Sequence, residues 1–133
     1  MTKIISINKK INNFQKKINV SGDKSLSIRW VLFSSLANGT STAKNLLKSE
    51  DVLAAVNVIK KLGIKVIMNK NVCKIFGKGI DGYKFKKNLT LNAQNSGTLG
   101  RLILGLLVNS PYAIKLIGDK SLSKRDFNRV IIP

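Results

Sequence analysis

Apolar residues recur at helical spacing in three segments of the chain. The first, residues 25–37, carries Leu26, Trp30, Phe33 and Ala37 at 4-3-4 spacing, widened by Val31, Leu32 and Leu36. The second follows an N-cap at Ser49 and carries Val52, Val56, Ile59 and Leu62 before Gly63. The third, residues 98–108, carries Leu99, Leu102, Ile103, Leu106 and Leu107. Each pattern predicts a helix with one buried apolar face.

Short β-rich runs around these segments predict strands. They cover residues 3–7, 17–20, 42–47, 64–68, 72–76, 89–93 and 113–117, with a hairpin-like turn at 69–71. A fourth helix is expected from Arg125. It runs into Pro133 without a stop signal, so we expect the chain to be a fragment of something longer. The mixture of strands and helices indicates an α/β fold of repeated units.

The sequence Gly-Asp-Lys-Ser-Leu-Ser-x-Arg occurs twice, at 22–29 and at 118–125. The first copy opens the first helix, whose N-terminus presents free N–H groups and a partial positive charge. Lys24, Ser25 and Arg29 lie in the first turns of this helix and predict a phosphate-binding site. The repeat therefore points to part of an enzyme that handles a phosphorylated, anionic substrate.

A formal net charge of +18 supports an anionic partner but leaves its class open. Such a surplus attracts nucleic acid, anionic membranes or anionic small molecules. Only four of the 24 basic residues are arginine, the side chain favoured for specific phosphate and base contacts, and the lysine pairs are scattered. A solvated lysine-rich surface is therefore favoured over a nucleic-acid groove. A basic nucleic-acid-binding module stays open as the alternative function.

The residue content argues against several other classes. No apolar run approaches the roughly 20 residues that span a bilayer, and the N-terminal segment has no signal-peptide core, so we expect a cytoplasmic protein. With no histidine and the single Cys73, we expect no metal, no cofactor and no histidine-dependent catalytic group. Residues 77–82 match G-x-G-x-x-G but precede no predicted helix, and the Gly22 segment lacks the glycines of a Walker A loop.

The segment Asn-Ser-Gly-Thr-Leu-Gly-Arg at 95–101 is a second candidate site at a helix start. Asn95 or Ser96 can cap the helix, and Gly97 lets a ligand approach the backbone. Arg101 lies one turn in on the same face. Taken alone, this pattern fits an ordinary capped helix with a surface arginine equally well. Its similarity to the cationic start of the first helix makes an anion site the favoured interpretation.

Four segments resemble motifs of the EPSP synthase (3-phosphoshikimate 1-carboxyvinyltransferase) family, in that family's order and spacing. They are residues 20–29, residues 45–52, the N-[AS]-G-T-x-x-R motif at 95–101 and the G-[DE]-x-S-L-x-x-R segment at 118–125. The resemblance covers about residues 18–133, the early portion of a family member. The UDP-N-acetylglucosamine enolpyruvyl transferase family fits less well, because it has Lys-Asn in place of Lys24-Ser25.

The resemblance implies an inside-out α/β barrel lobe of repeated β-α-β-α-β-β units, with parallel helices inside and sheets outside, here incomplete. By the same resemblance, residues 1–20 would be first strands belonging to the other lobe. Residues 21–133 would be a partial first lobe. The acidic residues and the lysine that transfer protons lie in the family's second lobe, so we expect no catalytic residue in this chain and no activity from it alone.

The resemblance also implies that the family's reaction, transfer of the enolpyruvyl group of phosphoenolpyruvate to shikimate 3-phosphate, is the function. It assigns substrate-binding roles to matching positions. Those for shikimate 3-phosphate are Lys24, Ser25 and Arg29, with Lys24 also reaching phosphoenolpyruvate; those for phosphoenolpyruvate are Gly97 and Arg125, with Asn95, Thr98 and Arg101 around them. In the second octapeptide, Lys120 and Ser121 stay without a role.

Three positions depart from the family pattern. Asp126 follows Arg125 where proline is usual, Gln94 stands where glycine is common, and Trp30 replaces a small residue. Because proline fixes the backbone and aspartate does not, we expect the Arg125 loop to be positioned differently in this chain.

Overall fold

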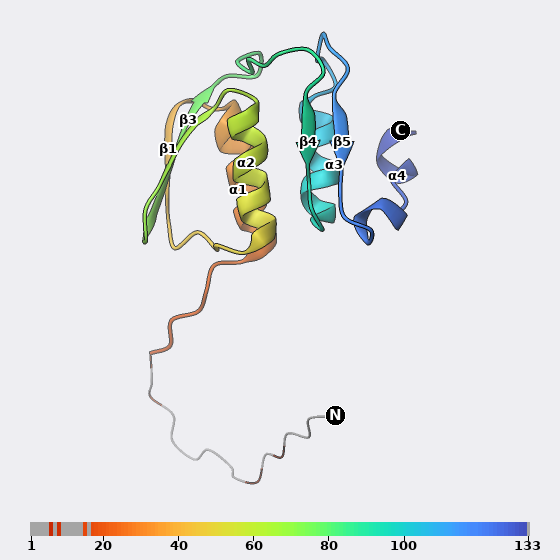
Figure 1. Ribbon diagram of the computed structural model, residues 1–133. Coiled ribbons are helices and arrows are strands. Elements are labelled where there is room, and N and C mark those ends of the chain that lie inside the picture. The colour runs from red at the N-terminus through yellow and green to blue at the C-terminus, as the bar shows by residue number, and fades with distance from the viewer. Residues whose placement is uncertain (1–5, 7, 9–14, 16, 133) are drawn as a thin grey trace.

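The computed structural model describes Ser6, Asn8, Gln15 and residues 17–132, which form helices packed against two sheets (Figure 1). The elements follow in the order α1 (Lys24–Leu36), β1 (Asn38–Lys44), α2 (Glu50–Lys61), β2 (Lys65–Met68), β3 (Val72–Lys78), β4 (Thr90–Asn92), α3 (Gly97–Leu106), β5 (Lys115–Ile117), the 3-10 turn η1 (Leu122–Lys124) and α4 (Asn128–Ile131). The α/β class expected from the sequence is confirmed.

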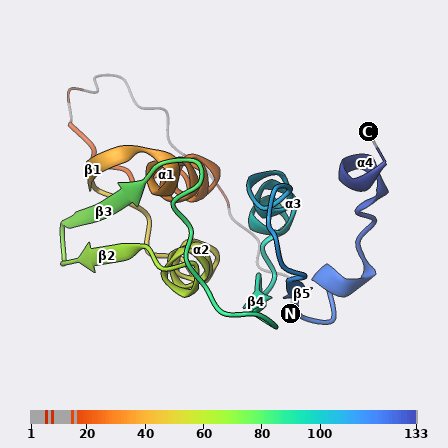
Figure 2. The same cartoon turned by 90° about the horizontal axis from the view of Figure 1, so that it is seen from above.

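β1, β3 and β2 form an antiparallel sheet in that order, with β3 in the centre. The turn predicted at 69–71 joins β2 to β3, and the Asn69 N–H donates to the Val72 carbonyl at 2.9 Å. Side chains alternate along β3, so that Cys73 and Ile75 are buried while their neighbours point outward. α1 and α2 cover the buried face of this sheet (Figure 2).

β4 and β5 form a separate parallel pair, and α3 is the crossover between them. α1, α2 and α3 lie side by side and run in the same direction, so their N-termini share one end of the molecule, the lower end in Figure 1. Figure 2 views the three helices end-on. η1 lies at the same end as these helix starts. This shared end is where the sequence places its candidate site.

The hydrophobic core lies where the helices meet the sheets. The largest fully buried side chains are Ile28, Leu32, Ile59, Leu62, Ile75, Leu91, Leu99 and Ile103. The stripe predicted for the second helix is confirmed, since Val52, Val56, Ile59 and Leu62 are all 3% exposed or less. Gly63 then ends α2 with a φ of 86°, a conformation that glycine adopts without strain.

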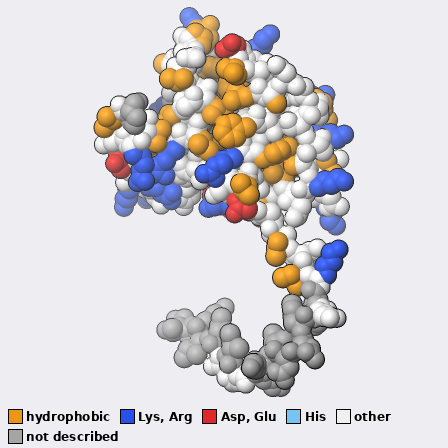
Figure 3. Space-filling view, turned by 180° about the vertical axis from the view of Figure 1, so that it is seen from behind, with side chains coloured by type: hydrophobic (Ala, Val, Ile, Leu, Met, Phe, Trp, Pro, Cys, Tyr) orange, Lys and Arg blue, Asp and Glu red, His pale blue; other side chains and the backbone are white. Residues whose placement is uncertain are grey.

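α1 buries only part of the predicted apolar face. Leu26 and Phe33 are 67% and 54% exposed, whereas Ile28, Val31 and Leu32 are fully buried. Figure 3 shows apolar side chains exposed among charged ones on the rear of the molecule. The apolar face predicted for the first helix is therefore wrong at Leu26 and Phe33 but correct at Val31 and Leu32, and the helix itself is confirmed.

Serines explain why the apolar pattern did not identify the whole buried face of α1. Its buried face includes Ser27, Ser34 and Ser35, which carry no hydrophobic signal. The Ser27 hydroxyl accepts a hydrogen bond from the Leu47 N–H at 3.2 Å. The Ser35 hydroxyl is 2.6 Å from the Tyr83 hydroxyl. Burying Ser27 and Ser35 is tolerated because their hydroxyls are paired.

Three other element predictions need correction. Residues 17–20 form no strand, because no described strand pairs with them. The strand predicted at 42–47 begins earlier, at Asn38, and ends at Lys44, since Asn45 takes a positive φ of 58°. The helix predicted from Arg125 begins only at Asn128, after η1 and an extended Arg125. The strand predicted at 3–7 lies outside the described residues apart from Ser6.

Both copies of the octapeptide begin with the same aspartate cap. Asp23 accepts a hydrogen bond from the Leu26 N–H at 2.7 Å, and Asp119 accepts one from the Leu122 N–H at 2.7 Å. The copies then diverge, because α1 continues for 13 residues whereas η1 makes a single turn. After η1, the Asp126 carboxylate accepts the Asn128 N–H at 2.7 Å, in a local turn immediately before α4. The replacement of proline by Asp126 therefore has a local structural role.

The C-terminal end of α1 lies directly against β3 at Gly77. A Cβ atom at this position would penetrate the carbonyl oxygens of Ser34 and Ala37, which are backbone atoms and cannot rotate away. The neighbouring Gly79 N–H donates to the Ala37 carbonyl at 3.2 Å. Gly77 is therefore required for the close approach of helix and strand.

Replacing Gly77 with alanine should destabilise the fold by about 1–3 kcal/mol, because the added methyl group forces backbone apart. Gly105→Ala is the matched control, since a Cβ at Gly105 in α3 meets nothing within 4 Å. The control should instead stabilise the protein by about 0.4–1 kcal/mol. Urea unfolding of both variants checks the contrast, and equal stability of the two would contradict the close contact.

Burial raises the pKa of the Tyr83 hydroxyl, and the hydrogen bond with Ser35 lowers it by less. The neutral phenol is thus favoured in the folded state. Its contribution to stability is fully present below about pH 10, the pKa of an unfolded tyrosine, and is lost as the pH rises through the higher folded pKa.

Comparing the wild type with Tyr83→Phe isolates this effect, because the two proteins differ only in this hydroxyl and the contributions of all other groups cancel. The difference in unfolding free energy between the two should be constant below about pH 9 and shift against the wild type above about pH 10. Chemical unfolding at several pH values measures it. Tyr112→Phe is the control at a tyrosine that is 41% exposed. A flat difference for Tyr83→Phe across about pH 8–11 would refute the buried phenol.

Candidate functional site

Two arginine side chains meet over the first residue of α3. A Cβ atom at Gly97 would lie 2.7 Å from Nη1 of Arg125 and 3.0 Å from Nη1 of Arg101. Gly97 is buried, so its missing side chain leaves the space that the two guanidinium groups occupy. Two cations and the free N–H groups of a helix start therefore face the same point, an arrangement suited to an anion.

Arg125 is held in place by two polar side chains. Its Nη2 donates to the Asn95 Oδ1 at 2.5 Å and to the Ser121 hydroxyl at 3.4 Å. Ser96 is the cap of α3, since its hydroxyl accepts the Leu99 N–H at 3.3 Å. Asn95 is therefore free to orient the arginine rather than the helix.

Arg101 is held from the opposite side by the segment that comes after Arg125. Its Nη2 donates to the Asp126 carbonyl at 3.3 Å, and its guanidinium lies 5.4 Å from the centre of the Phe127 ring. The Arg101 Nε atom is buried without a hydrogen-bond partner among the described residues. Neither contact supplies a negative charge, so the charge of Arg101 is not neutralised there.

Lys24 begins α1 and is paired with a carboxylate from α2. Its Nζ lies 3.0 Å from Asp51 Oδ2, and the two side chains are 55% and 19% exposed. Ser25 is half-buried beside it, and Arg29 is exposed one turn further along α1. Because the Lys24 side chain is more than half exposed, water screens this pair, and Lys24 can exchange Asp51 for another anion at modest cost.

The predicted site residues thus form two groups at one end of the molecule (Figure 1). One contains Asn95, Gly97, Arg101 and Arg125, which touch one another, with half-buried Thr98 next to them in α3. The other contains Lys24, Ser25 and Arg29 in α1. In the described residues no hydrogen bond or ion pair joins the two groups, so any bridge between them has to come from a ligand.

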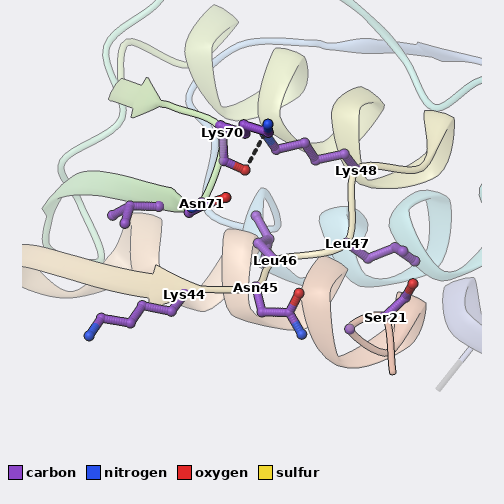
Figure 4. Close-up of a pocket in the computed structure, with 10 residues that line it drawn as sticks. Ser21, Lys44, Asn45, Leu46, Leu47, Lys48, Lys70 and Asn71 are labelled. Atoms are coloured by element: carbon purple, nitrogen blue, oxygen red, sulfur yellow. Dashed lines mark hydrogen bonds between the residues drawn. The ribbon is translucent and has the colours of Figure 1, made fainter. Parts of the chain in front are cut away.

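A separate pocket lies beside the start of α1, between the loop 44–48 and the β2–β3 turn (Figure 4). Its volume is about 560 Å³. Lys44, Lys48 and Lys70 line it together with Leu46 and Leu47. The Lys48 ammonium already donates to the carbonyls of Asn69 and Lys70 at 2.8 Å each, so it fastens the loop to the turn.

Sequence reasoning missed four residues that support the site: Asp51, Ser121, Asp126 and Phe127. From the sequence, Asp51 is only an acidic residue close to a helix start. Ser121 belongs to the repeat, and its spacing of four from Arg125 is the one signal that could have found it. Nothing in the sequence brings Phe127 against Arg101, because that contact spans two separate elements.

The described residues offer neither a metal-binding cluster nor a membrane-spanning helix. Within residues 17–132 and the three isolated positions before them, no three His, Cys, Asp or Glu side chains gather where they could bind a metal ion. Over the same residues, no helix has the length and apolar character required to cross a membrane.

Fold and site together define an α/β protein whose parallel helix starts gather arginines and a lysine at one end. Within this class, the chain belongs to the EPSP synthase (3-phosphoshikimate 1-carboxyvinyltransferase) family, whose sequence pattern matches residues 8–133. The resemblance inferred from the four motifs is therefore confirmed.

Individual relatives agree with this assignment. The chain is 43% identical over 125 residues to 3-phosphoshikimate 1-carboxyvinyltransferase of Sulfurihydrogenibium sp. (strain YO3AOP1), and 42% identical over 123 residues to that of Streptococcus sanguinis (strain SK36). These matches cover 94% and 92% of this chain but 29% of each relative. The structure of EPSP synthase from Acinetobacter baumannii matches with a TM-score of 0.82 at 35% identity, over 89% of this chain and 27% of that one. The chain thus spans less than a third of the length of these relatives.

The packing of both guanidiniums over Gly97 can be tested by Gly97→Ala. The new methyl group should displace Arg125 and Arg101 and break the bond between Arg125 and Asn95. The Nε–H resonances of both arginines in a ¹⁵N NMR spectrum report this displacement. Gly105→Ala, in the last turn of the same helix, should leave both resonances where they are. Unchanged arginine signals in Gly97→Ala would show that the guanidiniums do not converge at this glycine.

Proposed function

We propose that this chain provides substrate-anchoring residues for enolpyruvyl transfer, in which the enolpyruvyl group of phosphoenolpyruvate moves to shikimate 3-phosphate. The observation that carries the proposal is the meeting of Arg101 and Arg125 over Gly97, in a chain of the EPSP synthase family. Both substrates are anions that carry phosphate and carboxylate groups. Charge-assisted hydrogen bonds from arginine suit such groups, because the planar guanidinium donates two parallel bonds.

The two groups of residues take different substrates in this proposal. Lys24, Ser25 and Arg29 hold shikimate 3-phosphate at the start of α1, and Lys24 also reaches phosphoenolpyruvate. Gly97 and Arg125 hold phosphoenolpyruvate at the start of α3. Its other neighbours there are Asn95, Thr98 and Arg101. The gap between the groups, which no hydrogen bond or ion pair of the described residues bridges, is then filled by the two substrates lying next to each other.

Proton transfer is assigned to residues outside the matched portion. Two carboxylates beside the site already have partners, since Asp51 pairs with Lys24 and Asp126 accepts the Asn128 N–H. We therefore propose that the chain binds both substrates without catalysing their reaction, that a second lobe supplies the acid and base groups, and that residues 1–20 belong to that lobe. We also propose that the reaction takes place in the cytoplasm. Carboxyvinyl transfer by the purified 133-residue chain would overturn the first of these points.

Removing the Lys24 ammonium should weaken binding of shikimate 3-phosphate. A hydrogen bond to a charged group contributes about 1.5–3 kcal/mol, so Lys24→Ala should lower the affinity roughly 10- to 100-fold. Part of this loss is offset, because Lys24 no longer has to leave Asp51. Isothermal titration calorimetry of the whole chain with shikimate 3-phosphate measures the affinity.

Lys86→Ala is the matched control, because it removes the same charge from an exposed loop position away from both groups. It should leave the affinity within about twofold of the wild type, as expected for screened long-range charge. If Lys24→Ala and Lys86→Ala bind equally well, binding reflects the net charge of the chain and the start of α1 is not the anchor.

A further inference from the structure

Phe127 occupies a place that links three parts of the Arg101–Arg125 site. Its ring packs against α3, where a Cβ at Gly100 would come within 3.2 Å of the ring edge. The same ring lies 5.4 Å from the Arg101 guanidinium, within the range of a cation–π contact. Phe127 also comes two residues after Arg125, so it joins the segment of one arginine to the side chain of the other.

The electrostatics at Gly97 create a need for such a contact. The Nη1 atoms of Arg101 and Arg125 both lie within 3.0 Å of the same point, so the two like charges repel each other when no anion is bound. A carboxylate beside Arg101 would relieve the repulsion, but it would also compete with an anionic ligand. An aromatic face attracts the cation through its quadrupole and brings no negative charge.

The remaining contacts of Arg101 do not fix its orientation by themselves. Its Nη2 makes a single bond of 3.3 Å, to the Asp126 carbonyl, and its Nε has no partner among the described residues. Asp126 is held in turn by the hydrogen bond that its side chain accepts from the Asn128 N–H. The ring of Phe127 is therefore the contact best able to fix the position of the guanidinium.

We propose that Phe127 is a positioning residue for the anion site: its ring holds the Arg101 guanidinium over Gly97, beside Arg125, ready for a phosphate or carboxylate group. The inference rests on the proposed function and deepens it, since it identifies what keeps two like charges together over Gly97. Phe127 itself does not touch the ligand. It acts through Arg101. The three consecutive residues Arg125, Asp126 and Phe127 all contact α3, at Gly97 or at Arg101.

A purely structural role for Phe127 makes a different prediction. The residue also lines an apolar pocket with Leu104, Leu122 and Ile131, so its bulk contributes to packing. Packing depends on volume and apolar surface, which leucine largely retains. Cation–π attraction depends on the aromatic face, which tyrosine and tryptophan retain and leucine loses.

The test compares Phe127→Leu, Phe127→Tyr and wild type, each as the whole chain, with phosphoenolpyruvate and with inorganic phosphate as probes. NMR titration of the Arg101 and Arg125 Nε–H resonances gives the affinity at this site. Phe127→Leu should bind both probes about two- to fivefold more weakly, and Phe127→Tyr should bind as the wild type does. Urea unfolding of each variant confirms that the fold is retained. Phe33→Leu, at an exposed aromatic residue of α1, is the control and should not change binding.

The possible outcomes separate the role of the ring from the proposed function. Equal affinity of the wild type and both Phe127 variants overturns the role of the ring and leaves the proposed function standing. Weakened binding in Phe127→Leu that Phe127→Tyr does not restore shows a packing effect, and it too overturns the inference. A wild-type chain whose Arg101 and Arg125 signals respond to neither probe overturns the proposed site itself, and the role of Phe127 with it.

Discussion

The contact between the C-terminal ends of α1 and β3 sets the geometry on which the site depends. Gly77 brings helix and strand to backbone distance, and the Gly79 N–H closes the contact on the Ala37 carbonyl. With its C-terminus held there, α1 must point its first residues toward the opposite end of the sheet. α2 and α3 start at that end too (Figure 1), so the cationic residues near helix starts face one side of the molecule.

Placing cations at helix N-termini is unfavourable in isolation, because the helix dipole already puts partial positive charge there. The chain offsets this cost only in part. Asp23 caps α1 and Asp51 pairs with Lys24, whereas the Arg101 and Arg125 guanidiniums are held by an amide, a hydroxyl, a carbonyl and an aromatic ring. The site is thus positioned by neutral partners and keeps its charge. The arginines are thus pre-organised for an anion, because little of the binding energy has to be spent on ordering them.

The sequence was informative where local rules decide the outcome and misleading where tertiary contacts do. α2 followed its apolar stripe because a strongly amphipathic helix has only one face to bury. On α1, Ser27, Ser34 and Ser35 lie on the buried face, and the partners Leu47 and Tyr83 lie far along the chain, so hydropathy missed this part of the face and wrongly included Leu26 and Phe33. The second octapeptide matches the first in its aspartate cap but then leaves the helical path. After the single turn of η1, the Asp126 side chain accepts the Asn128 N–H. This local contact, which lies outside the repeat, determines the path of the chain there.

In the candidate site, too, the sequence located some residues and missed others. The motif at 95–101 and the arginine at 125 located the meeting point of two guanidiniums, since both motifs lie at element boundaries that sequence can recognise. The partners that orient them come from other elements, and no spacing rule predicts a ring from the start of α4 against an arginine of α3.

The apolar side chains on the outside of the molecule have a consequence for its behaviour in solution. Leu26, Phe33, Val108, Ile131 and Ile132 are between 54% and 78% exposed, on a chain whose formal charge is +18. At low ionic strength, electrostatic repulsion between molecules keeps these apolar side chains from contacting one another. Added salt shortens the Debye length to below about 10 Å and removes that protection. Raising the salt concentration to suppress nonspecific charge contacts is therefore expected to favour association through these apolar side chains.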